Sequence, residues 1–163
     1  MDFSQFENEY NLQQLELIIP QGHSFQMWVT PRFKNHFVEN SYEEFTSDII
    51  ANLAQNIDLF IDVGAHYGYY SLLVGQANPD CEIISYEPAP INYEILKRNI
   101  ELNHLKNATA VNQAVSNKNE QVNFNISTAS DNCAFINHPA TPTLKQINIQ
   151  SIPLSELLSE KKG

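Results

Sequence analysis

The spacing of apolar residues changes along the chain and marks off segments of different kinds. Near the N-terminus, LQQLELIIP (12–20) and SFQMWVT (24–30) alternate in part and flank Gln21 and Gly22. Two such runs around a Pro-Gln-Gly turn predict a β-hairpin or small ribbon. We therefore expect residues 1–40 to form an N-terminal β-ribbon ahead of the main fold.

The next segment has the period of a helix. Ser41 and Glu44 match a capping box, in which two side chains satisfy backbone N–H groups at a helix start. Apolar residues follow at helical spacing: Phe45, Ile49 and Leu53. We predict a helix over residues 42–56.

The middle of the chain alternates short apolar runs with helical segments. DLFIDV (58–63) and EIISYE (82–87) are apolar at successive positions, as in strands buried on both faces of a parallel sheet, and TAVNQAV (109–115) predicts a third strand. Apolar residues at helical spacing lie between these strands. The first helical segment ends at Asn78, and the second runs from Pro90 to about Asn103. This order predicts an α/β, Rossmann-like, doubly wound fold.

After Ser116 the pattern becomes a strict alternation of apolar and polar residues. VNFNIS (122–127) and QINIQSI (146–152) read as half-exposed antiparallel strands, and Pro153 precedes a short helical run, LSELLSE (154–160). We expect an antiparallel β-excursion after the third core strand. Together with the preceding elements it would form a partial cofactor-binding domain over residues 41–163.

A glycine turn joins the first core strand to its helix. Asp62, Gly64 and Gly68 form D-x-G-x-x-x-G at the carboxyl end of that strand, where ligands bind in open α/β sheets. A dinucleotide fingerprint starting at Gly64 would need glycines where the chain has His66 and Tyr69. This spacing disfavours a nicotinamide cofactor without excluding it.

S-adenosylmethionine suits the turn better, because it has a zwitterionic amino-acid end and no phosphates. Asp62 can accept from the ammonium group of such a ligand, while the N–H groups of the turn meet its carboxylate. Glu87, at the tip of the second strand, can accept both ribose hydroxyls of any adenosine ligand, and Pro88 fixes the exit of the chain. Ala114 and Val115 would form a small apolar wall for the adenine, with Gln113 as a polar contact.

The remaining histidines and cysteines suggest no further chemistry. His66 would face the ligand, either as a base or as a residue that orients the backbone. No pair of histidines has metal-ligand spacing, so we expect no metal site. Cys81 and Cys133 lack the spacing of a zinc or redox pair, and we interpret both as free thiols.

The net charge and the hydropathy of the chain disfavour some classes of binding partner. The 163 residues carry a net charge of -10 at pH 7, which repels nucleic-acid phosphates and anionic membranes. No apolar run is long enough to span a membrane, and the acidic N-terminus is unlike a signal peptide. We therefore expect a cytoplasmic protein with a small-molecule or glycan acceptor, and neither nucleic acid nor a membrane as a partner.

Three separated stretches occur in the order found in one family. FIDVGAHYGYYS (60–71), YEPAPINYEILKRNIELN (86–103) and VNQAVSN (111–117) resemble the FkbM-type methyltransferases, which carry a V-G-A-N-x-G-Y-Y-[ST] turn and an E-P-x-P-x-N helix start. The resemblance runs from about residue 42 to 158. It implies a class I fold that binds S-adenosylmethionine and methylates a hydroxyl of a sugar or secondary metabolite. Carried over by position, the residues on the cofactor motifs are Asp62, Gly64, Ala65, Gly68, Ser71, Glu87, Pro88 and Asn92.

The chain departs from the family pattern at three places. His66 replaces the usual Asn, and Ser155 stands where the family commonly has Asp. The chain also ends before the fourth core strand of the family. It therefore resembles the N-terminal portion of a family member, and its fold would be incomplete. The first strand would then be left with an exposed apolar edge, and we expect self-association through that edge.

The sequence thus predicts an S-adenosylmethionine-dependent O-methyltransferase, in which the protein positions the substrates and supplies a general base. No residue of the chain is identified as that base. A non-catalytic remnant or partner-dependent fragment is the second hypothesis, and a nicotinamide-dependent oxidoreductase is the third.

Overall fold

A three-stranded parallel sheet forms the centre of the fold, as the alternation of strands and helices predicts. In the computed structural model, which describes residues 12–39, 42–127, 131, 133–135 and 142–159, the strand order is β3-β4-β5. Asp62 pairs with Ser85 across the first two strands. The strands and their helices are β3 (Leu59–Val63), β4 (Glu82–Tyr86), β5 (Ala108–Val111), α2 (Glu44–Ala54), α3 (Tyr69–Ala77) and α4 (Pro90–Leu102).

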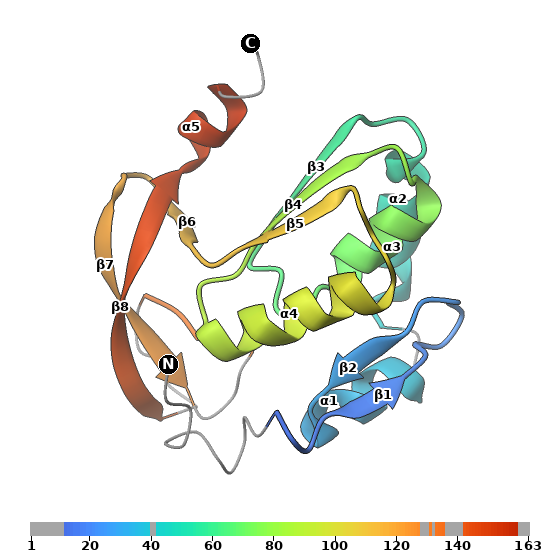
Figure 1. Cartoon of the computed structure of the whole chain (residues 1–163), viewed down its shortest axis with the longest axis horizontal. Helices are drawn as coiled ribbons and strands as arrows, with labels where there is room; N and C mark the ends of the chain where they lie inside the picture. Colours follow the sequence, from blue (N-terminus) through green and yellow to red (C-terminus); the bar gives the residue numbers. More distant parts are fainter. Residues whose placement is uncertain (1–11, 40–41, 128–130, 132, 136–141, 160–163) are drawn as a thin grey trace.

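The three helices lie on the same side of this sheet (Figure 1). Ala54 of α2 and Val74 of α3 pack with Ile83 of β4 in one buried cluster. Against expectation, β3 is not buried on both faces: its residues are half-buried, and Val63 is 53% exposed. The physical reason is that, among the described elements, helices cover only one face and β3 has only one neighbouring strand.

Helix α2 is shorter than predicted, and the apolar residues that predicted it face solvent rather than the core. It starts at Glu44 after Glu43, which has a left-handed backbone and no side-chain cap, while Ser41 lies outside the described residues. The helix packs against α3 through small and buried positions such as Ser47 and Ala54. Helical spacing therefore located the helix correctly but not its buried face, because the residues that gave the period are exposed: Phe45, Ile49 and Leu53.

The N-terminal ribbon is present and packs against the core. Strands β1 (Glu16–Ile18) and β2 (Met27–Val29) pair antiparallel, which confirms the predicted hairpin. They are followed by α1 (Pro31–Val38), a helix that we did not predict, with proline in its first turn. Ribbon and α1 side chains share one buried cluster with Tyr67 and Ile95 from the central part of the chain.

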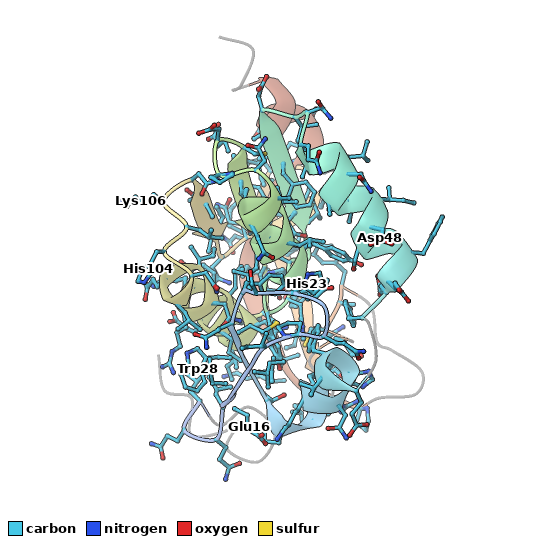
Figure 2. The ribbon with its side chains drawn as sticks, turned by 90° about the vertical axis from the view of Figure 1, so that its right-hand side faces the viewer. Glu16, His23, Trp28, Asp48, His104 and Lys106 are labelled. Carbon is cyan, nitrogen blue, oxygen red and sulfur yellow. The ribbon has the colours of Figure 1, made fainter. Side chains whose placement is uncertain are left out.

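Two asparagines, Asn99 in α4 and Asn103 just after it, bond the backbone of β2 and of the residue before it as a neighbouring strand would. Asn99 accepts the Trp28 N–H at 2.6 Å and donates to the Trp28 carbonyl at 3.0 Å, and its amide also donates to the Tyr67 carbonyl at 2.8 Å. One helical turn later, Asn103 bonds both backbone groups of Gln26. Figure 2 shows Trp28 below His104, which follows α4. These contacts fasten the ribbon to the central fold.

We expect Asn99→Ala to lower the free energy of unfolding by about 3 kcal/mol, because it leaves buried backbone groups without partners. Asn99 itself is fully buried. Asn103→Ala is the matched control, with an expected loss of about 1 kcal/mol, because water reaches the exposed Gln26 groups. Urea denaturation of both variants checks the difference, and equal losses would contradict the role given to Asn99.

A second sheet has the order β6-β8-β7 and contains the predicted antiparallel excursion. Strands β7 (Glu120–Ser127) and β8 (Thr143–Pro153) pair antiparallel, and β6 (Ala114–Ser116) pairs parallel with β8. Helix α5 (Leu154–Ser159) follows β8 in the chain. The continuous third strand predicted over 109–115 is therefore wrong. The chain leaves the central sheet after Val111, since Asn112 turns its side chain back to β4, and it resumes as β6 in the other sheet.

Strand β3 has an open edge. Among the described strands it pairs only with β4, so the opposite row of backbone N–H and C=O groups is available to another strand. We expect concentration-dependent association that Ile61→Lys weakens, because an edge lysine opposes strand pairing. Sedimentation velocity over a concentration series checks this expectation, with Gln55→Lys, an equal change in charge at an exposed residue outside the sheet, as the control. A wild-type chain that stays monomeric at high concentration would contradict it.

Candidate functional site

The turn after β3 adopts a backbone that most residues avoid. Gly64, His66 and Gly68 all have positive φ, at 76°, 51° and 90°. Glycine takes this conformation without strain, which explains the two glycines of the motif. A Cβ on Gly68 would lie 2.6 Å from Leu96 Cδ1, whereas a Cβ on Gly64 would meet no atom within 4 Å. Gly68 is therefore needed for packing, while Gly64 faces open space.

The N–H groups of this turn are used inside the protein. Gly64 and Ala65 donate to the Tyr86 carbonyl at 2.9 and 3.0 Å, and Gly68 donates to the Ala65 carbonyl at 2.7 Å. The sequence led us to expect turn N–H groups that point at a ligand carboxylate. In the structure the Gly64 and Ala65 donors instead bind the turn to the end of β4, and the Gly68 donor closes the turn on itself.

Asp62 joins β3 to the start of α3. Its Oδ2 accepts the Ser71 hydroxyl at 2.6 Å, and that hydroxyl lies 2.7 Å from the Ser85 hydroxyl on β4. Burial raises the pKa of the Asp62 carboxyl, while the hydroxyl and the backbone N–H of Ser71 act to lower it. The carboxyl group thus holds two elements together at the carboxyl end of the sheet.

Glu87 is a buried carboxyl at the tip of β4, with 4% exposure. Its Oε2 accepts the His66 N–H at 2.8 Å, and its Oε1 accepts the Ala89 N–H at 2.9 Å and the Asn92 amide at 3.5 Å. Burial raises the pKa of Glu87 to about 7, although these donors favour the charged form. A carboxylate has about four lone-pair sites, and these donors use three of them. One site on Oε2 is open to a ligand hydroxyl, and a second hydroxyl can replace the long Asn92 contact on Oε1.

His66 acts through its backbone. Its ring stacks on Tyr67, with centroids 3.7 Å apart, and meets the Phe33 ring edge-on at 5.0 Å. Burial lowers the pKa of His66 to about 3, so the imidazole is neutral at physiological pH and a poor proton acceptor. The sequence left two roles for His66, a base or a residue that orients the backbone. This geometry favours the second role.

Asn112 is a site residue that sequence reasoning missed. Its side-chain amide donates to the carbonyls of Glu87 at 2.8 Å and Pro88 at 3.1 Å. It thereby fixes the segment that carries the Glu87 carboxyl. The available signal was a polar residue in the middle of an apolar run, which marks the point where β5 ends.

A cavity of about 400 Å³ lies beside Glu87 and Gly64. It brings together five of the residues predicted from the sequence: Gly64, His66, Glu87, Pro88 and Asn92. The other lining residues come from α1, the segment before α2, β7 and the segment that follows it: Phe33, His36, Phe37, Tyr42, Phe124, Asp131 and Cys133. Because α1 was not predicted, its contribution to the cavity was missed as well.

The other predicted site residues lie around this cavity without lining it. Ala65, Gly68 and Ser71 are buried in the turn and the start of α3. Asp62 lies on β3, Gln113 is half-buried between β5 and β6, and Ala114 is buried in β6. Among them, Asp62 and Gln113 lie near the carboxyl ends of β3 and β5, and none of the six lines the cavity.

Two larger hollows lie elsewhere in the described part of the chain. They have volumes of about 480 and 530 Å³ and share His104, Leu105 and Lys106, after α4. Neither is lined by the glycine turn or by Glu87. Since ligands of open α/β sheets bind at the carboxyl ends of the strands, the smaller cavity is the candidate site.

Within the described residues, no group of three or more His, Cys, Asp and Glu side chains could hold a metal ion. Cys81 and Cys133 are free thiols, as predicted. The helices in the described part of the chain are all too short or too polar to cross a bilayer.

Comparisons with known proteins point in one direction. No protein-family model matches the sequence. Over 71 residues, 44% of this chain, it is 37% identical to methyltransferase sdnD of Sordaria araneosa and covers 25% of that protein. The chain thus spans about a quarter of the length of this curated relative.

Solved structures show the fold. The structure of TYW2 from Pyrococcus horikoshii in complex with MeSAdo matches with a TM-score of 0.51 and 22% identity, over 62% of this chain and 36% of that chain. A tRNA (uracil-54, C5)-methyltransferase of Pyrococcus abyssi matches with a TM-score of 0.44 and 11% identity, over 60% and 24%. The chain has the Rossmann-like fold of class I methyltransferases, which confirms the predicted fold class. Part of its sequence is similar to a methyltransferase.

Proposed function

We propose that this chain binds S-adenosylmethionine and forms the cofactor-binding part of a methyltransferase. The observation that carries the proposal is the buried carboxyl of Glu87 at the tip of β4, beside the open space over Gly64. A carboxyl group at this position suits two ribose hydroxyls, and an open backbone suits a closely approaching ligand. The similarity to a methyltransferase over 71 residues supports a methyl donor rather than a dinucleotide.

The residues along the strand tips fit the parts of such a cofactor. Glu87 would accept the ribose hydroxyls, and the remaining oxygen of Asp62 would accept from the ammonium group. Ala114 and Gln113 would border the adenine, next to the Asn112 amide that fixes the β4 tip. When bound, S-adenosylmethionine supplies an electrophilic methyl group. The protein binds, orients and shields the reactants from water.

The finer assignment that we propose is O-methylation of a hydroxyl on a sugar or secondary metabolite, within the FkbM-type family. The glycine turn, the E-P-A-P-I-N helix start and the V-N-Q-A-V-S-N stretch support it. The charge of -10 supports a small-molecule or glycan acceptor over a nucleic acid, because phosphate groups would be repelled.

Calorimetric titration with S-adenosylhomocysteine tests the proposal. We expect saturable binding in the micromolar range, about -8 kcal/mol, that is lost in an Asp62→Ala, Glu87→Ala double variant. A folded, monodisperse chain that binds NADH instead would favour an oxidoreductase. One that binds neither ligand would favour a non-catalytic or partner-dependent fragment, for which the open edge of β3 is the structural argument.

A further inference from the structure

The candidate cavity has two unlike walls. One is formed by the turn and the β4 tip, and the other is an aromatic wall from α1, the segment before α2, and β7: Phe33, Phe37, Tyr42 and Phe124. The predicted cofactor contacts Asp62, Gln113 and Ala114 lie along the strand tips, outside the lining. A cofactor held by them and by Glu87 would extend along the sheet and leave the aromatic wall for another molecule.

The aromatic wall is held in place before any ligand arrives. Phe37 stacks on Tyr69 with centroids 5.5 Å apart and meets Tyr42 at 4.6 Å. Phe33 meets the Tyr67 ring edge-on at 5.6 Å, and Phe124 meets Phe135 in the same way at 5.7 Å. Rings held in this way bind apolar rings at little entropic cost. The contact would use the small part of each ring that faces the cavity, because Phe33, Phe37 and Phe124 are 8, 3 and 3% exposed.

The charged groups around the cavity are negative. Glu87 and Asp131 are among its lining residues, which include no lysine or arginine. Asp131 lies close enough to Tyr42 to contribute, with Glu43 and burial, to the raised pKa of that phenol. An acceptor with a phosphate or carboxylate group would be repelled by these two acids, while the Arg32 guanidinium lies outside the lining, 5.7 Å from the Phe33 ring centroid.

We propose that the aromatic wall binds the methyl acceptor, and that the acceptor is a small molecule with an apolar ring and no negative charge. This proposal rests on the methyltransferase function proposed above. It extends that function by naming a wall, distinct from the cofactor contacts, and the class of molecule that the wall selects.

Cys133 provides a readout that does not depend on catalysis, because it lines the cavity and is half-exposed, while Cys81 is fully buried. The probe is 2-naphthol, an uncharged ring with a hydroxyl, and the matched anion is 2-naphthyl phosphate. With saturating S-adenosylhomocysteine present, we expect 2-naphthol to slow alkylation of Cys133 by N-ethylmaleimide at least about fivefold, and the phosphate to have little effect. Cys81 serves as the internal control.

Asp131→Lys, at an exposed position, tests whether negative charge excludes anionic acceptors from the cavity. The control is Asp80→Lys, which makes the same change in net charge at an exposed residue just before β4. We expect only Asp131→Lys to let 2-naphthyl phosphate protect Cys133. If 2-naphthol gives no protection although S-adenosylhomocysteine binds, the acceptor proposal is overturned and the proposed function stands. If 2-naphthol protects Cys133 but S-adenosylhomocysteine does not bind, the ring-binding wall stands and the methyltransferase function falls. Stronger protection of the wild type by the phosphate would also overturn the proposal.

Discussion

Gly64→Ala is expected to weaken binding of S-adenosylhomocysteine about 100-fold, because the added methyl group would occupy the space that the ligand needs. Gly64 lines the cavity, and a Cβ there meets no protein atom within 4 Å. The cost to folding should be only about 1 kcal/mol, from the positive φ. Calorimetry and urea denaturation of the same preparation measure the two effects.

Substitutions at two other glycines distinguish the effect of backbone strain from the effect of blocking the ligand. Gly22 also has a positive φ and open space around its Cβ, but it lies in the ribbon turn, away from the cavity. Gly22→Ala should therefore cost similar stability and leave binding unchanged. Gly68→Ala should lower stability further, because its Cβ would collide with Leu96. Unimpaired binding by Gly64→Ala would show that no ligand approaches the turn.

The second large effect is a pH dependence set by Glu87. Its pKa is raised from 4.5 to about 7, so its stabilising contribution is fully present below pH 4.5 and is lost as the pH rises through 7. The difference in unfolding free energy between wild type and Glu87→Gln should therefore fall by about 3 kcal/mol from pH 4.5 to pH 8. Urea denaturation across this range measures the difference, which should be flat if Glu87 has an ordinary pKa.

Ligand binding should show the opposite trend with pH. Ribose hydroxyls donate to the charged carboxylate, so S-adenosylhomocysteine favours ionised Glu87 and releases a proton on binding below pH 7. We expect the dissociation constant to be about tenfold larger at pH 6 than at pH 8. Neighbouring His66 stays neutral over this range, since its pKa is about 3. Calorimetry in buffers with different ionisation enthalpies counts the released protons.

Local patterns predicted those parts of the fold whose signals come from nearby residues. The apolar runs at β3 and β4 located the parallel strands, and the glycine turn between β3 and α3 marked the candidate site at the carboxyl end of the sheet. The hairpin around Gly22 and the β7–β8 pair were also visible as alternation. These elements need only their own side-chain period and turn residues.

Features that depend on distant contacts escaped prediction. The exposed face of α2, with Phe45 and Leu53, carries the strongest helical period of that segment, but packing against α3 selected the other side. The break after Val111 depends on Asn112 reaching the backbone of Glu87. Helix α1 begins at Pro31, a common residue at a helix start. Its packing places Phe33 and Phe37 at the cavity, and the local pattern does not reveal that placement.

The position of the site followed from topology, whereas its details did not. Asp62 and Glu87 end neighbouring parallel strands, and parallel strands bring their carboxyl ends to one edge. The sequence could not show that Glu87 binds the His66 N–H, or that turn donors close on Tyr86 rather than on a ligand. Those contacts depend on how the turn folds over β4.

The most direct test of the central claim is an amide ¹H–¹⁵N spectrum of the 18.6 kDa chain during titration with S-adenosylhomocysteine. We predict that the largest shifts fall on three segments that are distant in sequence and adjacent at the strand tips: 62–68, 87–92 and 112–114. Shifts confined to the hollows around His104 and Lys106, or no shifts in a folded chain at millimolar ligand, would contradict the account.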